Sequence, residues 1–475
     1  MTKIVCTMGP ATNSPEMIRS MIRAGMDVAR LNFSHGDHEG HGGILEEIRR
    51  ASEEANRPVG VLADLAGPKI RLGVLSTAER VLSYGEEVRL IAGVEAKGDE
   101  LPVNYPFLYE DVKEGARIML ADGRVELLAV KKQNDSILCH VVVGGVLTSH
   151  KGVNLPLSDL RIPAFTDKDR ADLSFALGMG VDFVAMSFVR HEHDLQPLKE
   201  MMVRIDRPPL LIAKIEKPQA VERLSEILEV VDGVMVARGD LGVEMPVEEV
   251  PMIQKKIIRE ARQAGKVVIT ATQMLGSMTT NPRPSRAEVT DVANAVLDGT
   301  DAVMLSEESA MGRYPVEAVM MMNKICQYTE PQLDWMRFLR EGLSDLLPLT
   351  EASITRAAAW LARDIEVAAI VAATHSGSTA RLMVRFRSPY PVVGLTSNER
   401  TCRQLCLSWG VLPALIPPCR NIDEMIEEVR KWVGKNGVAG PGDRLILTAG
   451  VPLQRPGTTN LIKVLEYEGL PEKGN

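Results

Sequence analysis

The chain has 475 residues and a formal net charge of −8, with 45% hydrophobic and 25% charged residues. These values are typical of a globular protein of about two to four domains, and they argue against an intrinsically disordered chain. The acidic balance excludes a strongly basic nucleic-acid-binding protein, and no apolar run reaches the ~18–20 residues that a membrane span needs.

The six cysteines are scattered and form no CxxC pair. Neither a disulfide framework nor a structural zinc site is therefore expected. The first residues also lack the apolar core of a signal peptide. We expect a cytoplasmic protein in a reducing compartment.

Short apolar, β-branched runs alternate with segments of helical period in two stretches of the chain. One such helix is predicted at 251–264, with apolar residues spaced by three and four positions. Eight strand–helix units with strands apolar on both faces predict a (β/α)₈ TIM barrel, formed by residues 1–70 and 163–335. The predicted strands are 4–6, 28–31, 59–62, 183–188, 210–215, 233–237, 267–271 and 302–305.

The interruption at 71–162 has shorter, alternating runs that predict an all-β domain inserted after barrel strand three. Asp122 and Gly123 lie between two of these runs, as in a β-hairpin. We expect a small β-barrel lid over the carboxyl ends of the barrel strands, where barrel active sites lie. A domain without a role in activity is the alternative.

From residue 346 to 475 a third pattern follows, in which helices and apolar strands alternate again. It predicts a separate, doubly wound α/β domain.

Polar residues follow the predicted barrel strands at their carboxyl ends, where catalytic groups of barrels are found. Lys214 and Glu216 are two positions apart, as are Arg30 and Asn32, so each pair shares one face of its strand. Such charges are costly to bury unless they are paired or bind ions.

Glu216 and Asp240 come from adjacent strands and are the oxygen ligands that Mg²⁺ or Mn²⁺ prefers. Lys214 is then placed to neutralise a developing oxyanion beside the cation. The alternative is that Lys214 and Glu216 form a purely structural ion pair. Arg30 and Arg71 suit bidentate binding of a phosphate or carboxylate.

Neither a GxxxxGK[ST] loop nor a GxGxxG fingerprint occurs in the chain. A P-loop or a dinucleotide-binding site of that type is therefore excluded. Phosphate binding must rest on arginine, lysine and metal.

The chain resembles the pyruvate kinase family over essentially its whole length. The segments that carry the resemblance are GMDVARLNFSH (25–35), DLAGPKIR (64–71), AKIE (213–216), MVARGDLG (235–242), ATQM (271–274), DAVMLSE (301–307) and GRYP (312–315). Each is weak alone, but their order along successive barrel strands is specific. The resemblance implies phosphoryl transfer from phosphoenolpyruvate to ADP, giving pyruvate and ATP.

The resemblance also assigns roles to particular residues. Lys214 would stabilise the enolate and the transferring phosphoryl group, and Arg30 would hold that group. Glu216 and Asp240 would bind Mg²⁺ or Mn²⁺. The substrate would be bound by Arg30, Gly239, Asp240 and Thr272, with its carboxylate on Gly239 and Thr272, and Thr272 would also take part in proton transfer. The nucleotide would be bound by Asn32, Phe33, Ser34, His35, Arg71 and Lys151.

Two departures from the family pattern concern cations and the nucleotide. Many members carry a Glu and need K⁺ where this chain has Lys69. We therefore expect Asn32, Ser34, Asp64 and Leu65 to remain as a monovalent-cation position in which the Lys69 ammonium makes K⁺ dispensable. His191 stands where many relatives have a Lys.

In the family, the loop that corresponds to Thr374, Ser376, Gly377, Ser378 and Thr379 binds phosphorylated effectors. A Ser/Thr/Gly loop before a helix suits a phosphate, although a plain helix cap is the alternative. The resemblance also implies allosteric regulation and a homotetramer.

A different enzyme class remains open, namely a Mg²⁺-dependent barrel lyase or aldolase that acts on an oxaloacetate-like acid. Such enzymes also place Glu and Asp on barrel strands and stabilise an enolate. They need no nucleotide site, so Arg71, Lys151 and the lid favour the kinase.

Overall fold

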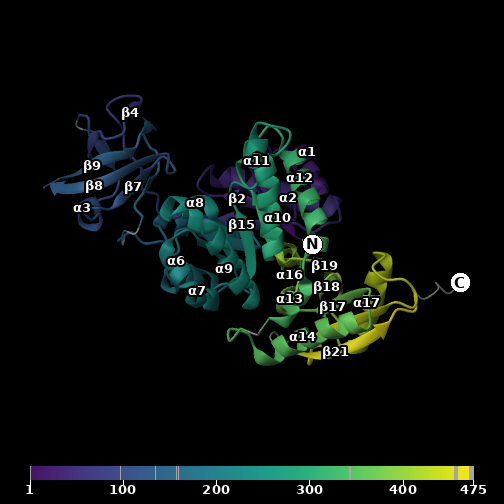
Figure 1. Cartoon of the computed structure of the whole chain (residues 1–475). Coiled ribbons are helices and arrows are strands. Elements are labelled where there is room, and N and C mark those ends of the chain that lie inside the picture. The colour runs from purple at the N-terminus through teal and green to yellow at the C-terminus, as the bar shows by residue number, and fades with distance from the viewer. Residues whose placement is uncertain are drawn as a thin grey trace.

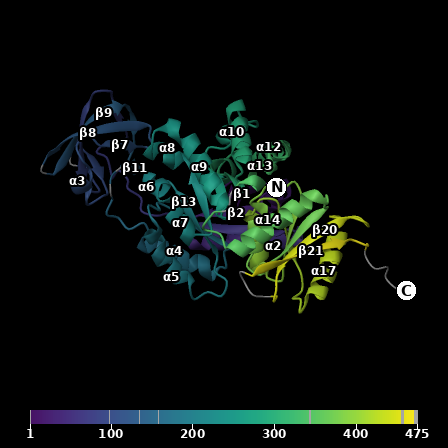
Figure 2. The same cartoon turned by 60° about the horizontal axis from the view of Figure 1, so that its bottom comes forward.

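The computed structural model describes residues 2–96, 98–133, 135–156, 158, 160–341, 344–453 and 458–469. A closed barrel of eight parallel strands occupies its centre. An inserted β domain and a C-terminal α/β domain lie on opposite sides of this barrel (Figures 1 and 2). The predicted fold class is confirmed.

The barrel strands follow one another around the ring in chain order, and the last strand pairs with the first. All eight are buried along nearly their whole length, which explains their continuous apolar runs. They are β1 (Lys3–Thr7), β2 (Val28–Asn32), β3 (Gly60–Asp64), β12 (Phe183–Met186), β13 (Leu210–Ile215), β14 (Gly233–Ala237), β15 (Val267–Ala271) and β16 (Ala302–Leu305).

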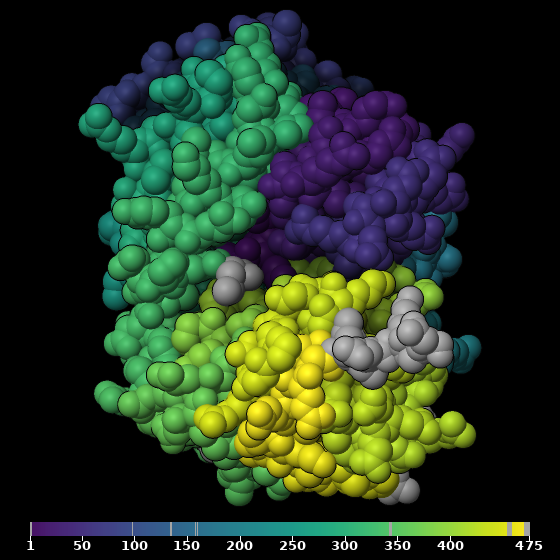
Figure 3. Space-filling model, turned by 90° about the vertical axis from the view of Figure 1, so that its right-hand side faces the viewer, coloured from purple at the N-terminus to yellow at the C-terminus, as the bar shows by residue number. Residues whose placement is uncertain are grey.

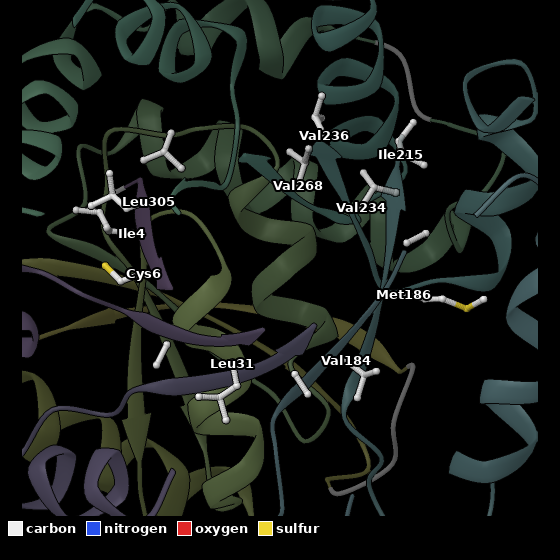
Figure 4. Close-up of a cluster of buried hydrophobic side chains, with 14 of the residues drawn as sticks. Ile4, Cys6, Leu31, Val184, Met186, Ile215, Val234, Val236, Val268 and Leu305 are labelled. Atoms are coloured by element: carbon white, nitrogen blue, oxygen red, sulfur yellow. The ribbon is translucent and has the colours of Figure 1, made fainter. Parts of the chain in front are cut away.

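Two apolar layers hold the barrel together. Strand residues such as Cys6, Leu31 and Val184 pack with the surrounding helices, and Figure 4 shows part of this cluster. The other face of the strands, with Val5, Leu62 and others, fills the barrel interior. Strand side chains alternate between these layers.

The helices around the barrel begin after the strands they follow, and several carry capping residues such as Ser14 and Thr166. The predicted helix at 251–264 is α9 (Val250–Gln263). The others are α1 (Pro15–Ala24), α2 (His38–Glu54), α4 (Asp167–Gly178), α5 (Gln196–Met202), α6 (Pro218–Glu222), α7 (Leu224–Val230), α8 (Arg238–Glu244), α10 (Arg286–Asp298), α11 (Glu307–Ala310), α12 (Pro315–Thr329) and α13 (Trp335–Arg340).

The inserted β domain, which we call the lid, follows barrel strand β3 as predicted. Its six-stranded sheet has the order β11-β7-β8-β9-β5-β6, and bridges from Arg71 to Gly152 and from Leu72 to Val103 nearly close it. Positive φ angles at Asp122 and Gly123 make the predicted hairpin between β7 and β8. The elements are β4 (Arg80–Leu82), β5 (Glu87–Ala92), β6 (Leu101–Val103), α3 (Leu108–Asp111), β7 (Arg117–Leu120), β8 (Val125–Gln133), β9 (Ser136–Val143), β10 (Gly145–Leu147) and β11 (Val153–Asn154).

The C-terminal domain has a five-stranded sheet in the order β19-β18-β17-β20-β21, parallel except for the edge strand β21. Apolar clusters cover both faces of the sheet, as a doubly wound fold requires. The elements are α14 (Leu349–Asp364), β17 (Ala369–Ala373), α15 (Ser378–Val384), β18 (Val392–Thr396), α16 (Glu399–Gln404), β19 (Val411–Leu415), α17 (Ile422–Lys435), β20 (Arg444–Gly450) and β21 (Thr459–Glu466).

The C-terminal domain closes the amino end of the barrel. Cys406 and Leu407 belong to the apolar cluster of the barrel interior, and Lys3 Nζ donates to the carbonyl of Val411 at 2.8 Å. Figure 3 shows the close packing of the two domains from the side. The carboxyl end of the barrel is therefore the end left for the lid and for a site between them.

All six cysteines are buried free thiols. Among the described residues, none of the helices has the length and apolarity that a bilayer crossing requires.

Candidate active site

The carboxyl ends of β2, β3 and β13 bring a group of buried charges together. Arg30, Asp64, Lys214 and Glu216 belong to these strands or follow them directly, and their side chains contact one another. Because alternate strand residues face the barrel interior, the two-residue spacing of Lys214 and Glu216 puts both on the same side. The expected position of Lys214 and Glu216 on one side of the strand is therefore present.

Asp64 is the anion at the centre of this group and is 1% exposed. Its Oδ2 accepts from Arg30 Nε at 2.7 Å, and its Oδ1 lies 3.4 Å from Lys214 Nζ. Arg30 also donates to Thr7 Oγ1 at 2.9 Å. Burial favours the neutral acid, but Lys214 and Arg30 outweigh it and lower the pKa of Asp64.

Lys214 contacts two carboxylates and one hydroxyl group. Its Nζ lies 2.9 Å from Glu216 Oε1 and donates to Ser187 Oγ at 2.8 Å, in addition to the contact with Asp64. Burial favours the neutral amine, but Asp64 and Glu216 outweigh it and raise the pKa of Lys214. Lys214 is therefore a fixed ammonium, and the ion pair considered as a structural alternative exists within a larger charged group.

Glu216 and Asp240 provide the oxygen atoms for a divalent cation. Glu216 Oε2 accepts from the backbone N–H of Phe188 at 2.9 Å, which fixes the carboxylate. Within the described parts of the chain, the Asp240 carboxylate has neither a hydrogen bond nor an ion pair. Burial and the neighbouring charge of Glu216 raise the pKa of Asp240 to about 7. A carboxylate without an ion-pair partner beside a second carboxylate fits a hard cation such as Mg²⁺ or Mn²⁺.

Gly239 and Thr272 meet beside this carboxylate pair. The Gly239 N–H donates to Thr272 Oγ1 at 2.8 Å, and that hydroxyl donates to the carbonyl of Ala271 at 2.7 Å. Thr272 has a φ of +67°, which is strained for a β-branched residue. Strain of this kind is often kept at functional sites.

Arg238 supports the strained turn. Its guanidinium donates to the carbonyl of Thr272 at 2.6 Å and to that of Ala271 at 3.2 Å, and it is paired with Asp291 at 2.6 Å. The sequence marked Arg238 only as a residue at a strand end. Its role in holding the turn follows from the tertiary contacts.

A cleft of about 460 Å³ lies between the lid and the barrel. His35 and Asp240 line it from the barrel, and Lys69, Arg71 and Lys151 line it from the lid side. Burial, with Lys69, Arg71 and Arg30 nearby, lowers the pKa of His35. The predicted nucleotide residues His35, Arg71 and Lys151 thus face one concave, cationic space next to the carboxylate pair.

The other predicted nucleotide residues form a turn after β2. Asn32 Oδ1 accepts from the backbone N–H of Ser34 at 3.1 Å, so these two residues fix the turn. Phe33 is 3% exposed, and its ring packs on the ring of His41 with centroids 4.5 Å apart. The Phe33 side chain therefore belongs to the core and not to the cleft.

Several oxygens of the predicted monovalent-cation position, including Asp64 Oδ2 and the Leu65 carbonyl, have partners within the protein. The carbonyl of Leu65 accepts from Ser187 Oγ at 2.7 Å, and Asp64 is paired as described above. Gly67 has a φ of +64°, and a Cβ there would lie 2.7 Å from the Phe188 ring. This turn leads to Lys69, whose pKa is lowered by partial burial and by Arg71 and Lys214.

Two predicted groups lie outside the cleft. The His191 Nε2 is 3.7 Å from Asp194, and His191 does not line the cleft. The loop residues Thr374, Ser376, Ser378 and Thr379 line a separate cavity of about 80 Å³ in the C-terminal domain, and Gly377 caps α15 with a φ of +84°. Thr379 Oγ1 is 2.7 Å from Thr459 Oγ1.

Sequence reasoning missed a second buried ion pair at the cleft. Lys217 Nζ lies 2.6 Å from Glu244 Oε1, and the lid residue Asn154 donates to the same oxygen at 2.9 Å. The signal available in the sequence was the spacing of four between Asp240 and Glu244, which puts both carboxylates on one side of a helix. The contact across strands and domains could not be deduced from it.

Comparison with known proteins gives a consistent result for both parts of the chain. The family model "Pyruvate kinase, barrel domain" matches residues 1–319, and "Pyruvate kinase, alpha/beta domain" matches residues 352–465.

Individual relatives agree over the whole length. A pyruvate kinase of Geobacillus stearothermophilus is 45% identical over 100% of this chain and 81% of its own length. One from Clostridium perfringens is 43% identical over 98% of this chain and 99% of its own. The crystal structure of a pyruvate kinase from Cryptosporidium parvum superposes with a TM-score of 0.93 at 34% identity, covering 98% of this chain and 96% of that one.

Proposed function

The chain belongs to the pyruvate kinase family, and we propose from this membership that it transfers the phosphoryl group of phosphoenolpyruvate to ADP in glycolysis. The observation that carries the proposal is the buried Arg30–Asp64–Lys214–Glu216 group at the barrel end that faces the cationic cleft. In this reaction an oxygen of the ADP β-phosphate attacks phosphorus and the bond to the enol oxygen breaks. The enolate then takes a proton at carbon to become pyruvate.

Arg30 and Lys214 are assigned to the phosphoryl group and the enolate oxygen. Asp64 fixes both cations before the substrate arrives, so little reorganisation is needed when charge develops. Phosphoryl transfer depends mainly on such alignment and neutralisation of charge.

Glu216 and Asp240 are assigned to the divalent cation, Mg²⁺ or Mn²⁺. When bound, this cation would neutralise phosphoryl and enolate oxygens as a Lewis acid. The Phe188 N–H orients Glu216 for this task. The Asp240 carboxylate, which forms no ion pair among the described residues, would gain a direct positive partner.

Gly239 and Thr272 are assigned to the substrate carboxylate. Their polar groups are bonded to each other, so the carboxylate would replace Thr272 Oγ1 as the acceptor of the Gly239 N–H. The freed hydroxyl of Thr272 is then available to pass a proton to the enolate.

Arg71, Lys151 and the turn of Asn32, Phe33, Ser34 and His35 are assigned to the nucleotide. Arg71 and Lys151 carry the charge for its phosphates. The Phe33 ring supports the turn from the core, so its contribution would be indirect. Closure of the lid, to which we assign residues 71–162, would exclude the water that competes with ADP.

We assign the Lys69 ammonium to the role that K⁺ has in many relatives. It would serve the monovalent-cation position formed by Asn32, Ser34, Asp64 and Leu65. Lys69 lines the cleft, where burial, Arg71 and Lys214 lower its pKa and where Asp64 and Asp240 partly oppose that shift by favouring the charged form. The Leu65 carbonyl is already bonded to Ser187. K⁺ is therefore dispensable in this proposal.

We assign the cavity at 374–379 to a phosphorylated effector, because the hydroxyl groups that line it can donate hydrogen bonds to a phosphate.

A cytoplasmic homotetramer is the proposed assembly. Two exposed apolar side chains, Met311 directly after α11 and Met320 on the adjacent helix α12, support a buried subunit interface. Light scattering on the purified protein measures the assembly directly.

The test is pyruvate production from phosphoenolpyruvate with Mg²⁺, with and without ADP. Pyruvate that requires ADP, with one ATP formed per pyruvate, is the expected result. Turnover without ADP would instead indicate a lyase or phosphatase and would remove the nucleotide role of Arg71 and Lys151.

A further inference from the structure

We propose that Asn154, Lys217 and Glu244, which we call the latch, are positioning residues that connect the lid to the spacing of the two cation ligands. The inference rests on the proposed function of Glu216 and Asp240. It adds residues that touch neither the cation nor the reacting atoms.

The latch is a buried ion pair with a third partner from the lid. Glu244 is 3% exposed and Lys217 is 7% exposed. Glu244 Oε1 accepts from Lys217 Nζ at 2.6 Å and from Asn154 Nδ2 at 2.9 Å. A charge-assisted bond in such surroundings fixes its partners firmly, and loss of one partner leaves the other charge buried and unpaired.

The ion pair joins the two elements that carry the proposed cation ligands. Lys217 follows Glu216 directly at the end of β13. Glu244 lies one helical turn after Asp240 in α8. The Lys217–Glu244 bond therefore fixes the distance between the end of β13 and α8. Partners of this outer kind set the affinity of a metal site.

The lid rests on the same helix. Asn154 belongs to β11, close in sequence to Lys151. Gly123 in the lid hairpin lies so near α8 that a Cβ at this position would be 3.4 Å from the Val243 side chain. A movement of the lid is thus passed to α8 through Glu244. Among the described residues Glu244 Oε2 is buried without a hydrogen-bond partner, so its capacity as an acceptor is unused in this position of the lid.

Direct binding of Mn²⁺ to the substrate-free protein, measured by electron paramagnetic resonance, tests the link to the cation site. We expect Lys217→Met and Glu244→Gln each to weaken binding about 10-fold. The sign of the Lys217→Met effect is decisive, because removal of a positive charge near the site would by itself tighten cation binding. Lys255→Met, which breaks a Lys–Asp pair between α9 and α10, is the matched control and leaves binding unchanged.

Steady-state kinetics with Asn154→Ala tests the link to the lid. We expect the KM for ADP to rise about 10-fold and ADP-independent hydrolysis of phosphoenolpyruvate to appear, while Mn²⁺ affinity stays within about twofold. Tighter or unchanged Mn²⁺ binding by Lys217→Met, or an unchanged KM for ADP in Asn154→Ala, would overturn the latch.

Two controls separate the possible failures. If Lys217→Met does not fold, unchanged Mn²⁺ binding by Glu244→Gln would overturn the latch, because loss of the ion pair and loss of a negative charge near the site should both weaken cation binding. Thermal unfolding of each variant reports whether it folds. A wild-type protein that binds Mn²⁺ but forms no pyruvate with ADP would overturn the proposed function instead.

Discussion

Arg30 and Lys214 are bound to opposite oxygens of one buried carboxylate, because Asp64 Oδ2 accepts from Arg30 at 2.7 Å and its Oδ1 lies 3.4 Å from Lys214. Two cations that would otherwise repel each other are thereby held side by side at the barrel end. The proposed function assigns both of them to the phosphoryl group and the enolate oxygen. Asp64 thus organises the site without being one of the groups assigned to the substrate.

Substitution of Asp64 by Asn should therefore affect stability and activity together. Two buried cations would lose their shared anion, which costs about 3 kcal/mol of unfolding free energy. Misplaced cations would lower kcat about 100-fold. Urea unfolding and ADP-dependent pyruvate formation measure the two effects.

Asp182→Asn is the matched control for that variant. Asp182 is also fully buried between two arginines, Arg49 and Arg403, at 2.8 Å from each. It lies at the contact with the C-terminal domain, so we expect a similar loss of stability with near-normal kcat. Equal losses of kcat in both variants would contradict the organising role of Asp64.

Lys214→Arg keeps the charge but should not keep the activity. The guanidinium is larger and planar, so it cannot satisfy Ser187, Asp64 and Glu216 from the position of the ammonium. We expect kcat to fall about 100- to 1,000-fold, with a KM for phosphoenolpyruvate close to that of the wild type. A rise in KM with unchanged kcat would mean that Lys214 contributes only to substrate binding.

The activity should depend on the hydroxyl group of Thr272 and not on its methyl group. Thr272→Val removes the acceptor of the Gly239 N–H and the donor to Ala271, whereas Thr272→Ser keeps both. We expect kcat to fall about 100-fold in the first variant and to change little in the second. The rate of proton incorporation into pyruvate from labelled water measures the affected step directly.

The wild-type enzyme should be equally active in K⁺ and in an inert quaternary ammonium salt at the same ionic strength. Lys69→Glu removes a positive charge from the cleft and adds a negative one near Asp64, so we expect activity that now depends on added K⁺. The ratio of the rates in the two salts is the measurement. Strong activation of the wild type by K⁺ would contradict the assignment of Lys69.

Stability should decrease on acidification because of His41. Burial is the main cause that lowers the pKa of His41 below its usual 6.5, and its ring also packs on Phe33. The unfolded chain therefore takes up the proton first, and stability present above about pH 6.5 is lost as the pH falls below it. Urea unfolding from pH 5.5 to 8 should show a shallower pH dependence in His41→Gln than in His193→Gln, the exposed control.

The sequence by itself was sufficient for the architecture and for part of the site. Continuous apolar strands predicted a barrel, alternating runs predicted the lid, and a spacing of two put Lys214 and Glu216 on one face. These features are local, since they depend on strand periodicity and on the closure rule for parallel strands.

Only the tertiary structure decided which groups share a partner. Two carboxylates join segments that are far apart in the chain. Asp64 lies between Arg30 and Lys214, and Glu244 lies between Lys217 and Asn154. The core position of the Phe33 ring and the strained turn at Thr272 also depend on surrounding packing. Periodicity specifies the face of an element that is buried, whereas the partner across that face is set by the register and packing of elements distant in sequence.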